Sequence, residues 1–340
     1  MEYGRIIQKE RLKYFEIADN VFAAMSPYKG ISWANAAFVN RGKGLVYDTF
    51  FDLYYAREMR QCFEEVSGGR APAFLVNSHS NADHVFGNKV FEDATLIMHK
   101  ESRREHQKPS ESVEFPDKVI RNPETPGERY LHDEWIGFDM TGVEWRDPDI
   151  ETDQDLRVML DGTEVQVLSV APAHSDSDLL VWMPKERVLF AGDVVHIGCG
   201  AYSDEGIRNW TRVLDRIIDL NPEVVVPGHG ALCGVRTVRE QKAYLEHVVE
   251  EFNKYYDDDI TTLELCRKAD VSDYLHWIQP ERIYMSMDSL LKGKRGLPPI
   301  PDWDKMSEEQ AILREYQKRR YGARYQTWDP YITWSETFRP

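Results

Sequence analysis

The chain has 340 residues, 42% of them hydrophobic and 12% aromatic, which is enough to build one large domain with an appendage. Its formal net charge of −16 argues against nucleic acid or an anionic membrane surface as a partner, because both select for basic faces. The N-terminal segment is charged from its second residue and no long apolar run follows, so we expect neither a signal peptide nor a membrane span.

The four cysteines, Cys62, Cys199, Cys233 and Cys266, are too sparse for a disulfide framework. Their spacing also differs from that of zinc fingers and zinc ribbons. We therefore expect buried or partly buried free thiols in a reducing compartment, and hence a cytoplasmic protein.

In the first two-thirds of the chain, short runs typical of strands alternate with turns and helices. Strands are predicted at residues 20–25, 35–40, 44–50, 72–78 and 94–99, and helices at 52–66 and 82–91. Further strands are predicted at 163–172, 178–184, 187–195 and 223–228, with a helix at 207–220. Residues 101–150 do not follow this alternation of strands and helices, since they are polar, are interrupted by prolines and show only weak periodicity of apolar residues. Such a segment is typical of an insertion that forms a lid or a dimer contact.

After about residue 235 the pattern becomes helical. Helices are predicted at 235–259, 280–293 and 307–322, the last with Ser307 and Gln310 spaced like a capping box. The tail at 323–340 holds two tryptophans and two tyrosines, which favours packing on its own domain or on a twin subunit over disorder. The chain thus divides into a domain at 1–235 and a helical extension at 236–340, and we expect a homodimer.

Four segments that follow predicted strands supply side chains of the kinds that bind metals. They are "HSNADH" with His79, Asn81, Asp83 and His84, "VAPAHSDSD" with His174, "VLFAGDVVH" with Asp193, and "VVVPGHG" with His229. A lone histidine after a strand is more often structural, but this joint occurrence predicts a metal site. Imidazole and carboxylate together suit zinc, with iron or manganese as alternatives.

These motifs make the chain similar to the metallo-β-lactamase superfamily over about residues 18–235. The hallmark of that family is His-x-His-x-Asp-His after a strand, then a distant His, a bridging Asp and a final His. Here Asn81 stands where the second histidine is expected. The resemblance implies an α/β (α+β) fold, a four-layer αββα sandwich with metals at the open edge between two sheets. Residues 1–235 would be the catalytic domain, to which the insertion and the C-terminal helices are added.

The resemblance also assigns ligands to two metal positions. The first would use His79 and His174, with Asn81 in place of an imidazole. The second would be complete, with Asp83, His84, Asp193 and His229. Because an amide oxygen is a weaker donor to zinc than an imidazole nitrogen, we expect one ion per chain at the second position and a weak first position.

The same residues are candidates for catalysis. Water on a metal loses a proton more readily, and Asp83 or Asp193 would accept that proton. If the first position is empty, His79 and His174 are candidates for proton transfer or for orienting the leaving group. Asn81 would then donate a hydrogen bond to a developing oxyanion.

Three further residues are candidates for a supporting role around the metals. Asp48, at the end of a predicted strand, would orient the loop that carries the metal-binding histidines. Alternatively, it is an aspartate of an ordinary turn and has no role at the metal site. His196, three residues after Asp193, would line the substrate pocket, or else lie in the core or at the surface. Trp135 in the insertion would cover the site and contact an apolar or aromatic substrate. Alternatively, it only packs the insertion against the rest of the domain.

The sequence thus predicts a metal-dependent hydrolase of a small organic molecule, such as a lactone, an ester, an amide or an activated C–X bond. One alternative is a metal-binding interaction or regulatory protein without catalysis. Another is a phosphodiester or thioester hydrolase of the same superfamily. A nuclease is disfavoured by the acidic balance and by the lack of a basic stretch interleaved with aromatics.

Overall fold

The computed structural model describes residues 3–27, 30, 32–108, 111–201, 206–298 and 301–325. An eight-stranded sheet comes first, with its strands side by side in chain order. They are β1 (Ile6–Gln8), β2 (Lys13–Ala18), β3 (Val21–Met25), β4 (Ala36–Val39), β5 (Leu45–Tyr47), β6 (Phe74–Val76), β7 (Thr95–His99) and β8 (Ile150–Thr152). The sheet is antiparallel from β1 to β5 and parallel from β5 to β8.

A second sheet has the order β13-β12-β11-β10-β9. Its strands are β9 (Leu156–Leu160), β10 (Thr163–Ser169), β11 (Leu179–Met183), β12 (Val188–His196) and β13 (Val224–His229). Every residue of β11, β12 and β13 is buried, as expected for strands covered on both faces. Valine, leucine and phenylalanine side chains of the two sheets form one continuous core between them.

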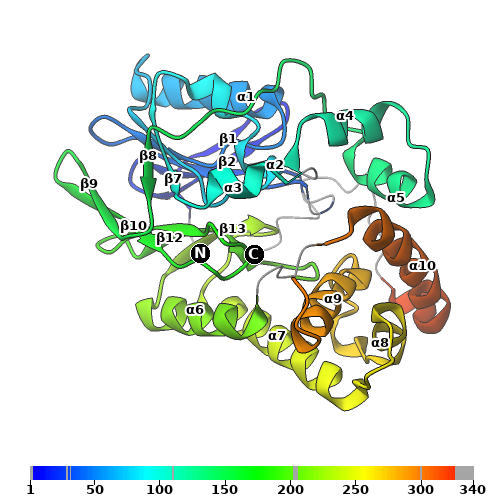
Figure 1. Cartoon of the computed structure of the whole chain (residues 1–340). Helices are drawn as coiled ribbons and strands as arrows, with labels where there is room; N and C mark the ends of the chain where they lie inside the picture. Colours follow the sequence, from blue (N-terminus) through cyan, green and yellow to red (C-terminus); the bar gives the residue numbers. More distant parts are fainter. Residues whose placement is uncertain are drawn as a thin grey trace.

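Helices cover the outer face of each sheet (Figure 1). Helix α1 (Leu53–Ser67) lies on the eight-stranded sheet, with Asp52 as its N-cap and Gly68 in the left-handed conformation at its end. Helices α6 (Ile207–Leu220) and α7 (Val235–Tyr255) lie on the other sheet. The order helix, sheet, sheet, helix confirms the predicted four-layer sandwich.

The insertion and the C-terminal helices lie together at one end of the sandwich (Figure 1). The insertion contains α3 (Ser102–His106), α4 (Glu114–Arg121) and α5 (Pro126–Trp135), after the short α2 (Ala82–Val85) and η1 (Asn88–Phe91). The C-terminal part contains α8 (Thr262–Lys268), η3 (Ser272–Tyr274), η4 (Pro280–Arg282), α9 (Ile283–Lys294), α10 (Trp303–Tyr321) and η5 (Gly322–Arg324). Helix α10 packs along α5, so the end of the described chain contacts the insertion.

Two local predictions were wrong. The last helix begins at Trp303 with Asp302 as its N-cap, whereas Ser307 lies inside the helix and donates to the Trp303 carbonyl. Strands β1 and β2 were not predicted, and β2 lacks the alternating burial of a typical strand, since the adjacent residues Tyr14 and Phe15 are both buried. Most of the aromatic tail, residues 326–340, lies outside the described residues.

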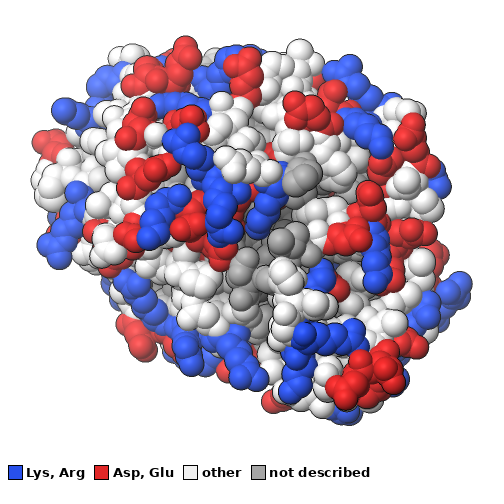
Figure 2. Space-filling model, in the orientation of Figure 1, with Lys and Arg blue, Asp and Glu red and all other residues white. Residues whose placement is uncertain are grey.

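The distribution of charge on the surface and the state of the cysteines agree with what the composition predicts. On the face shown in Figure 2, acidic and basic side chains are interspersed, without a continuous basic stripe. None of the described helices is both long enough and apolar enough to cross a membrane. All four cysteines are free and buried, as predicted.

A buried ionic cluster joins the insertion to the C-terminal helices. Glu281, which has no exposed surface, accepts hydrogen bonds from Arg314 Nε at 2.8 Å, from Tyr325 Oη at 2.5 Å and from Tyr130 Oη at 3.3 Å. Tyr130 comes from α5, whereas the other partners come from the last third of the chain. The cluster therefore fixes the position of α10 over the insertion.

We expect Glu281→Gln to lower the stability of the protein by about 3 kcal/mol, because the buried Arg314 loses its closer carboxylate partner and Glu134, at 3.7 Å, balances its charge less well. Thermal and denaturant unfolding measure this loss. The exposed Glu308→Gln on α10 is the matched control and should change stability by less than about 0.5 kcal/mol. Equal effects of the two variants would contradict a structural role for the cluster.

Candidate metal centre

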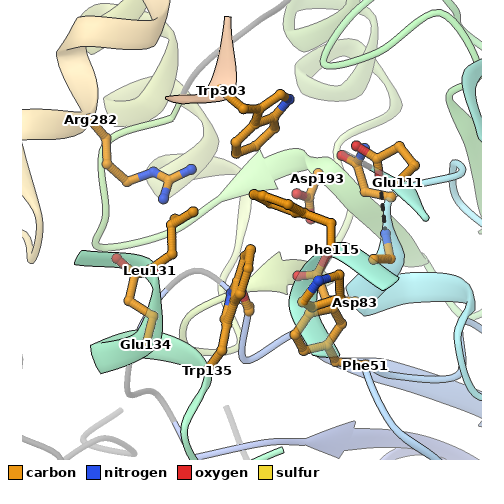
Figure 3. Close-up of a pocket in the computed structure, with 14 residues that line it drawn as sticks. Phe51, Asp83, Glu111, Phe115, Leu131, Glu134, Trp135, Asp193, Arg282 and Trp303 are labelled. Atoms are coloured by element: carbon orange, nitrogen blue, oxygen red, sulfur yellow. Dashed lines mark hydrogen bonds between the residues drawn. The ribbon is translucent and has the colours of Figure 1, made fainter. Parts of the chain in front are cut away.

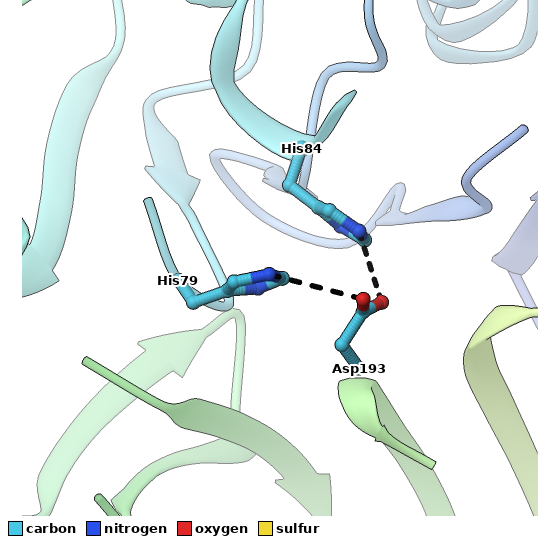
Figure 4. A group of neighbouring side chains, drawn as sticks. All are labelled: His79, His84 and Asp193. Atoms are coloured by element: carbon cyan, nitrogen blue, oxygen red, sulfur yellow. Dashed lines mark ion pairs between the residues drawn. The ribbon is translucent and has the colours of Figure 1, made fainter. Parts of the chain in front are cut away.

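The predicted metal-binding side chains converge at one edge of the two sheets. The loop after β6 and helix α2 carry His79, Asn81, Asp83 and His84, the loop after β10 carries His174, and β12 and β13 carry Asp193 and His229. All seven residues meet, and His196 at the end of β12 joins them. Asp193 lies at the centre of the group, and the rings of His79 and His84 both point at it (Figure 4).

One oxygen of Asp193 faces the residues predicted as the complete metal position. Oδ1 lies 3.0 Å from His84 Nε2 and 3.3 Å from His229 Nε2. Asp83 Oδ2 lies 3.3 Å from the same nitrogen of His229 and 3.8 Å from His84 Nε2. Four donors thus surround one point, with the number and the chemistry that zinc takes from proteins.

The other oxygen of Asp193 faces three further imidazoles. Oδ2 lies 2.7 Å from His196 Nε2, 3.5 Å from His174 Nε2 and 3.9 Å from His79 Nε2. Asp193 therefore has a separate set of neighbours at each oxygen, which is the arrangement of a carboxylate that can bridge two metal positions.

Asn81 occupies the space between two of these histidines. Its Oδ1 is 2.9 Å from His79 Nε2 and 3.0 Å from His174 Nε2. Both ring nitrogens must carry a proton in order to donate to the amide oxygen, and a protonated nitrogen cannot bind a metal. In this conformation the amide holds the two rings in place.

Buried hydrogen bonds fix the orientation of the rings. Asp48, fully buried, accepts from His84 Nδ1 at 2.9 Å and from Ser78 N and Oγ at 2.7 and 2.8 Å. With its Nδ1 proton held in this way, His84 directs the lone pair of Nε2 at the metal position. Asp48 thus lies where the sequence places a supporting carboxylate.

Two other carboxylates hold the histidine loops. Glu105 of α3 accepts from Ser80 Oγ and Asp176 N, both at 3.0 Å, and so joins the His79 loop to the His174 loop. Asp178 accepts from Ala173 N and Ser175 N, both at 2.9 Å, and burial raises the pKa of Asp178 to about 8. Neither residue was predicted, since each is one of many acidic residues in an acidic chain.

The electrostatics of the group favour a cation at its centre. Burial opposes ionisation of Asp193, but His196, His229 and His84 hold its pKa well below the usual value. Burial would lower the pKa of His84, but Asp193, Asp83 and Asp48 raise it well above its usual range, and His229 is shifted in the same direction. A metal ion would therefore replace protons that these two rings carry when it is absent.

Buried donor atoms that lack hydrogen bonds support the same conclusion. Within the described part of the chain, His84 Nε2, His229 Nε2 and Asp193 Oδ1 make no hydrogen bond of good geometry, although the two nitrogens lie 3.0 and 3.3 Å from that oxygen. Buried polar atoms are normally satisfied by a partner, so exceptions that meet at one point need an explanation. The residues present therefore fit a bound metal ion.

Gly228, in the "PGHG" segment, leaves the space that Oδ1 of Asp193 occupies. A Cβ atom at this position would overlap Asp193 Oδ1 and the backbone of Gly192. We expect Gly228→Ala to displace Asp193 and to lower bound zinc to below half of the wild-type content, as measured by elemental analysis. Gly234→Ala, at the N-cap of α7, is the control, because its Cβ would have only an ordinary contact at 3.6 Å. Unchanged zinc in Gly228→Ala would show that Asp193 can move without loss of metal.

A pocket opens directly over the two aspartates. Asp83 and Asp193 share its lining with Asn81, for which the sequence leaves two roles open, a weak metal ligand or a hydrogen-bond donor to substrate. The rest of the lining is mainly aromatic and apolar, with Phe51, Phe115, Pro116, Leu131, Trp135 and Trp303. Figure 3 shows Arg282 extending from the C-terminal helices toward the space that the rings of Phe115 and Trp303 border. Glu111, at the opposite side, accepts from Ala82 N at 3.2 Å.

The aromatic residues of the insertion have different positions. Trp135 lines the pocket and donates to Ser32 Oγ at 2.6 Å. Tyr130 points instead to Glu281, Phe138 packs on Trp33, and Trp145 stacks on His106. Phe115, Arg282 and Trp303 were missed because they lie far from the motifs in sequence and carry no local signal.

A sequence model described as the metallo-beta-lactamase superfamily matches residues 34–229, more than half of the chain. The chain belongs to the metallo-beta-lactamase superfamily. Membership supports a metal-dependent hydrolase, and the clusters of histidine and aspartate provide the residues that could hold the metal.

Curated relatives cover parts of the chain. A "Metallo-beta-lactamase type 2" of Bacteroides fragilis is 30% identical over 105 residues, which are 29% of this chain and 42% of the relative. A "2,4-dinitroanisole O-demethylase subunit alpha" of Nocardioides sp. (strain JS1661) is 23% identical over 185 residues, 54% of this chain and 48% of the relative. The chain thus spans less than half the length of these relatives.

Solved structures of the superfamily share the fold. A metallo-beta-lactamase family protein from Thermus thermophilus has a TM-score of 0.57 and 20% identity, and the match covers 82% of this chain and 97% of that one. A metallo-beta-lactamase from Pontibacter korlensis has a TM-score of 0.52 and 15% identity, covering 69% and 99%. At these identities the likeness shows the four-layer fold alone.

Proposed function

We propose that the chain is a zinc-dependent hydrolase that acts on a small substrate carrying an aromatic ring. The observation that carries this proposal is the pocket in which Phe51, Phe115, Trp135 and Trp303 meet Asp83 and Asp193. A cavity in which four aromatic rings lie beside metal-type ligands fits a flat apolar group bound next to the reacting bond. The bond belongs to the predicted set, which is a lactone, an ester, an amide or an activated aryl C–X bond.

We further propose that zinc fills first the position formed by Asp83, His84, Asp193 and His229, since its donors are complete. When bound there, zinc supplies a water of lowered pKa and polarises the bond that is cleaved. Asp83 is the better placed base, because its side chain is 14% exposed and lies in the pocket lining. Asn81, in the same lining, is placed to donate a hydrogen bond from its amide nitrogen to the oxyanion.

Arg282 selects a polar or anionic substituent on the ring. Its side chain is almost completely buried and shares the pocket lining with Glu134, whose charge balances part of its own. A guanidinium in such a place recognises nitro or carboxylate oxygens in a planar, two-point manner. The name of the Nocardioides relative refers to a nitroaromatic substrate, which agrees with this assignment.

The remaining predictions about the whole protein are also kept as proposals. A cytoplasmic location without a nucleic acid or membrane partner agrees with the net charge of −16 and the free thiols, and the homodimer is kept as a proposal beside it. The insertion would act as a lid, because α5 and α10 together form one wall of the pocket.

Hydrolysis assays with matched substrate pairs test this function. Methyl phenylacetate and methyl acetate, or 3-isochromanone and δ-valerolactone, present similar reacting groups, each with an alkoxide leaving group, with and without an aromatic ring. Zinc-loaded protein should act on the aryl member of at least one pair, and a chelator should remove the activity. Absence of hydrolysis across esters, lactones, amides and nitroaryl ethers, by protein with a full zinc content, would leave the non-catalytic binding protein as the better hypothesis.

Trp135→Ala should lower kcat/KM for the aryl substrate about tenfold and that for the aliphatic partner by no more than two- to threefold. An aromatic contact of this kind contributes about 1 kcal/mol beyond simple burial, and most of it is lost with the ring. Trp145→Ala is the matched control, because Trp145 lies in the same insertion but stacks on His106 outside the pocket. Equal losses for both substrates would mean that Trp135 acts on the fold and not on recognition.

A further inference from the structure

We propose that the chain has a second metal position at Oδ2 of Asp193, for a divalent ion such as zinc, in which His196 supplies the imidazole that Asn81 lacks. The inference rests on the metal centre of the proposed function, but not on the hydrolysis. This proposal differs from the expectation of one ion per chain. It gives the weaker metal position, that of His79 and His174, a further ligand that the metal-binding motif of the family does not contain.

The donor atoms at this position lie close enough together to meet around one metal ion, and His196 Nε2, now in hydrogen-bond contact with Asp193 Oδ2, would move slightly away from it when an ion binds between them. Nε2 atoms of His174 and His196 lie 3.5 and 2.7 Å from Asp193 Oδ2, and the three residues bring one donor each within 4.8 Å of one another. Two donors that each lie about 2.05 Å from a tetrahedral zinc are about 3.3 Å apart. His79 Nε2, at 3.9 Å from the same oxygen, is near enough to complete the set.

The backbone of β12 explains how His196 reaches the same side as Asp193. In a regular strand, residues three apart point to opposite faces. Here the pairing with β13 shifts register between Phe190 and Gly192 and again between Gly192 and His196, and Gly192 has a φ of +49°. Irregularities of this kind often redirect a side chain next to a functional site.

His196 is also held in place by buried partners from two helices. Gln241 of α7, only 1% exposed, accepts from His196 N at 3.0 Å and donates to the Val194 carbonyl at 3.1 Å. Trp210 of α6 donates to the same carbonyl at 2.8 Å. The strand end is therefore rigid, as the support of a metal ligand should be.

The position of Asn81 agrees with this exchange of ligands. Asn81 lines the pocket, whereas His196 is fully buried and lies outside the pocket lining. A metal ion bound at Oδ2 would replace the contacts of His79 and His174 with Asn81 Oδ1, so the imidazoles of His79, His174 and His196 would form the donor set and the released amide of Asn81 could contact substrate. The result is a centre in which Asp193 bridges two ions, each with its own imidazoles.

The test is zinc binding by the metal-free full-length chain, measured by isothermal titration and by elemental analysis after gel filtration. We expect two ions per wild-type chain with the second bound more weakly, one ion in His196→Gln, and two in Asn81→Ala. His99→Gln, a buried histidine outside the cluster, should also keep two. A wild-type chain with one ion, or a His196→Gln variant with two, would overturn the proposal. So would loss of the second ion in Asn81→Ala, because Asn81 would then be the ligand.

A crystal of the wild-type protein grown with zinc gives an answer that does not depend on whether His196→Gln folds. Anomalous difference density should show a second ion about 2.0–2.1 Å from His196 Nε2. A second ion bound by Asn81 and not by His196 would refute the inference. Two ions in the predicted places without hydrolysis of any substrate would refute the proposed function and leave this inference standing.

Discussion

Asp193→Asn should remove both bound zinc and hydrolysis. This carboxylate is the one group that faces both sets of ligands, with Oδ1 toward His84 and His229 and Oδ2 toward His174 and His196. Asparagine keeps the shape of the side chain but replaces one oxygen by an amide nitrogen, which repels a cation. Loss of the metal removes several kcal/mol of transition-state stabilisation, so kcat/KM should fall about 10³-fold or more.

Asp52→Asn is the matched control for this substitution. Asp52 is also buried and caps α1 through Tyr54 N and Tyr55 N, and asparagine is an equally good N-cap. We expect the control to keep the zinc content and the activity of the wild type, as measured by elemental analysis and by steady-state kinetics. If Asp193→Asn kept both ions, the metal centre would have to be elsewhere, and the convergence of histidine side chains on Asp193 would be structural.

The sequence predicts the fold and the position of the metal centre well, because both depend on local patterns. Buried strands are continuous apolar runs, and the residues that follow them lie at one edge of a sandwich. The match of a superfamily model to residues 34–229 confirms the resemblance on which the layer order was based. The metal ligands lie in the last residues of such strands or in the segments that follow them, so their convergence needs no knowledge of distant contacts.

The pocket and the position of His196 could not be predicted in the same way. Arg282 and Trp303 reach the pocket only because the C-terminal helices pack on the insertion, and that packing depends on contacts such as the one between Arg314 and Glu281. For His196 the strand pattern is misleading, since strict alternation places it on the face opposite Asp193. The one signal in the sequence is Gly192, whose positive φ accompanies the register shifts.

Asp48→Asn should weaken zinc binding about 10- to 100-fold, the usual cost of losing a carboxylate behind a metal-binding histidine. Ser78 N donates to Asp48 Oδ1, so an asparagine that keeps this bond turns its NH2 group toward His84 Nδ1. His84 must then accept at Nδ1 and carry its proton on Nε2, which cannot bind a metal.

The affinity is measured by competition with a chromogenic chelator. Ser78→Ala is the control for the first ion, because it leaves the carboxylate of Asp48 facing His84, although it removes the hydroxyl contacts with Asp48 and with Nδ1 of His79, a ligand of the weaker position. We expect its zinc affinity to change less than threefold. An affinity of Asp48→Asn equal to that of the wild type would mean that His84 can take either tautomer without cost. In that case the buried carboxylate, whose pKa is raised by burial although His84 and Ser78 oppose the shift, would serve the packing of the loop and not the metal.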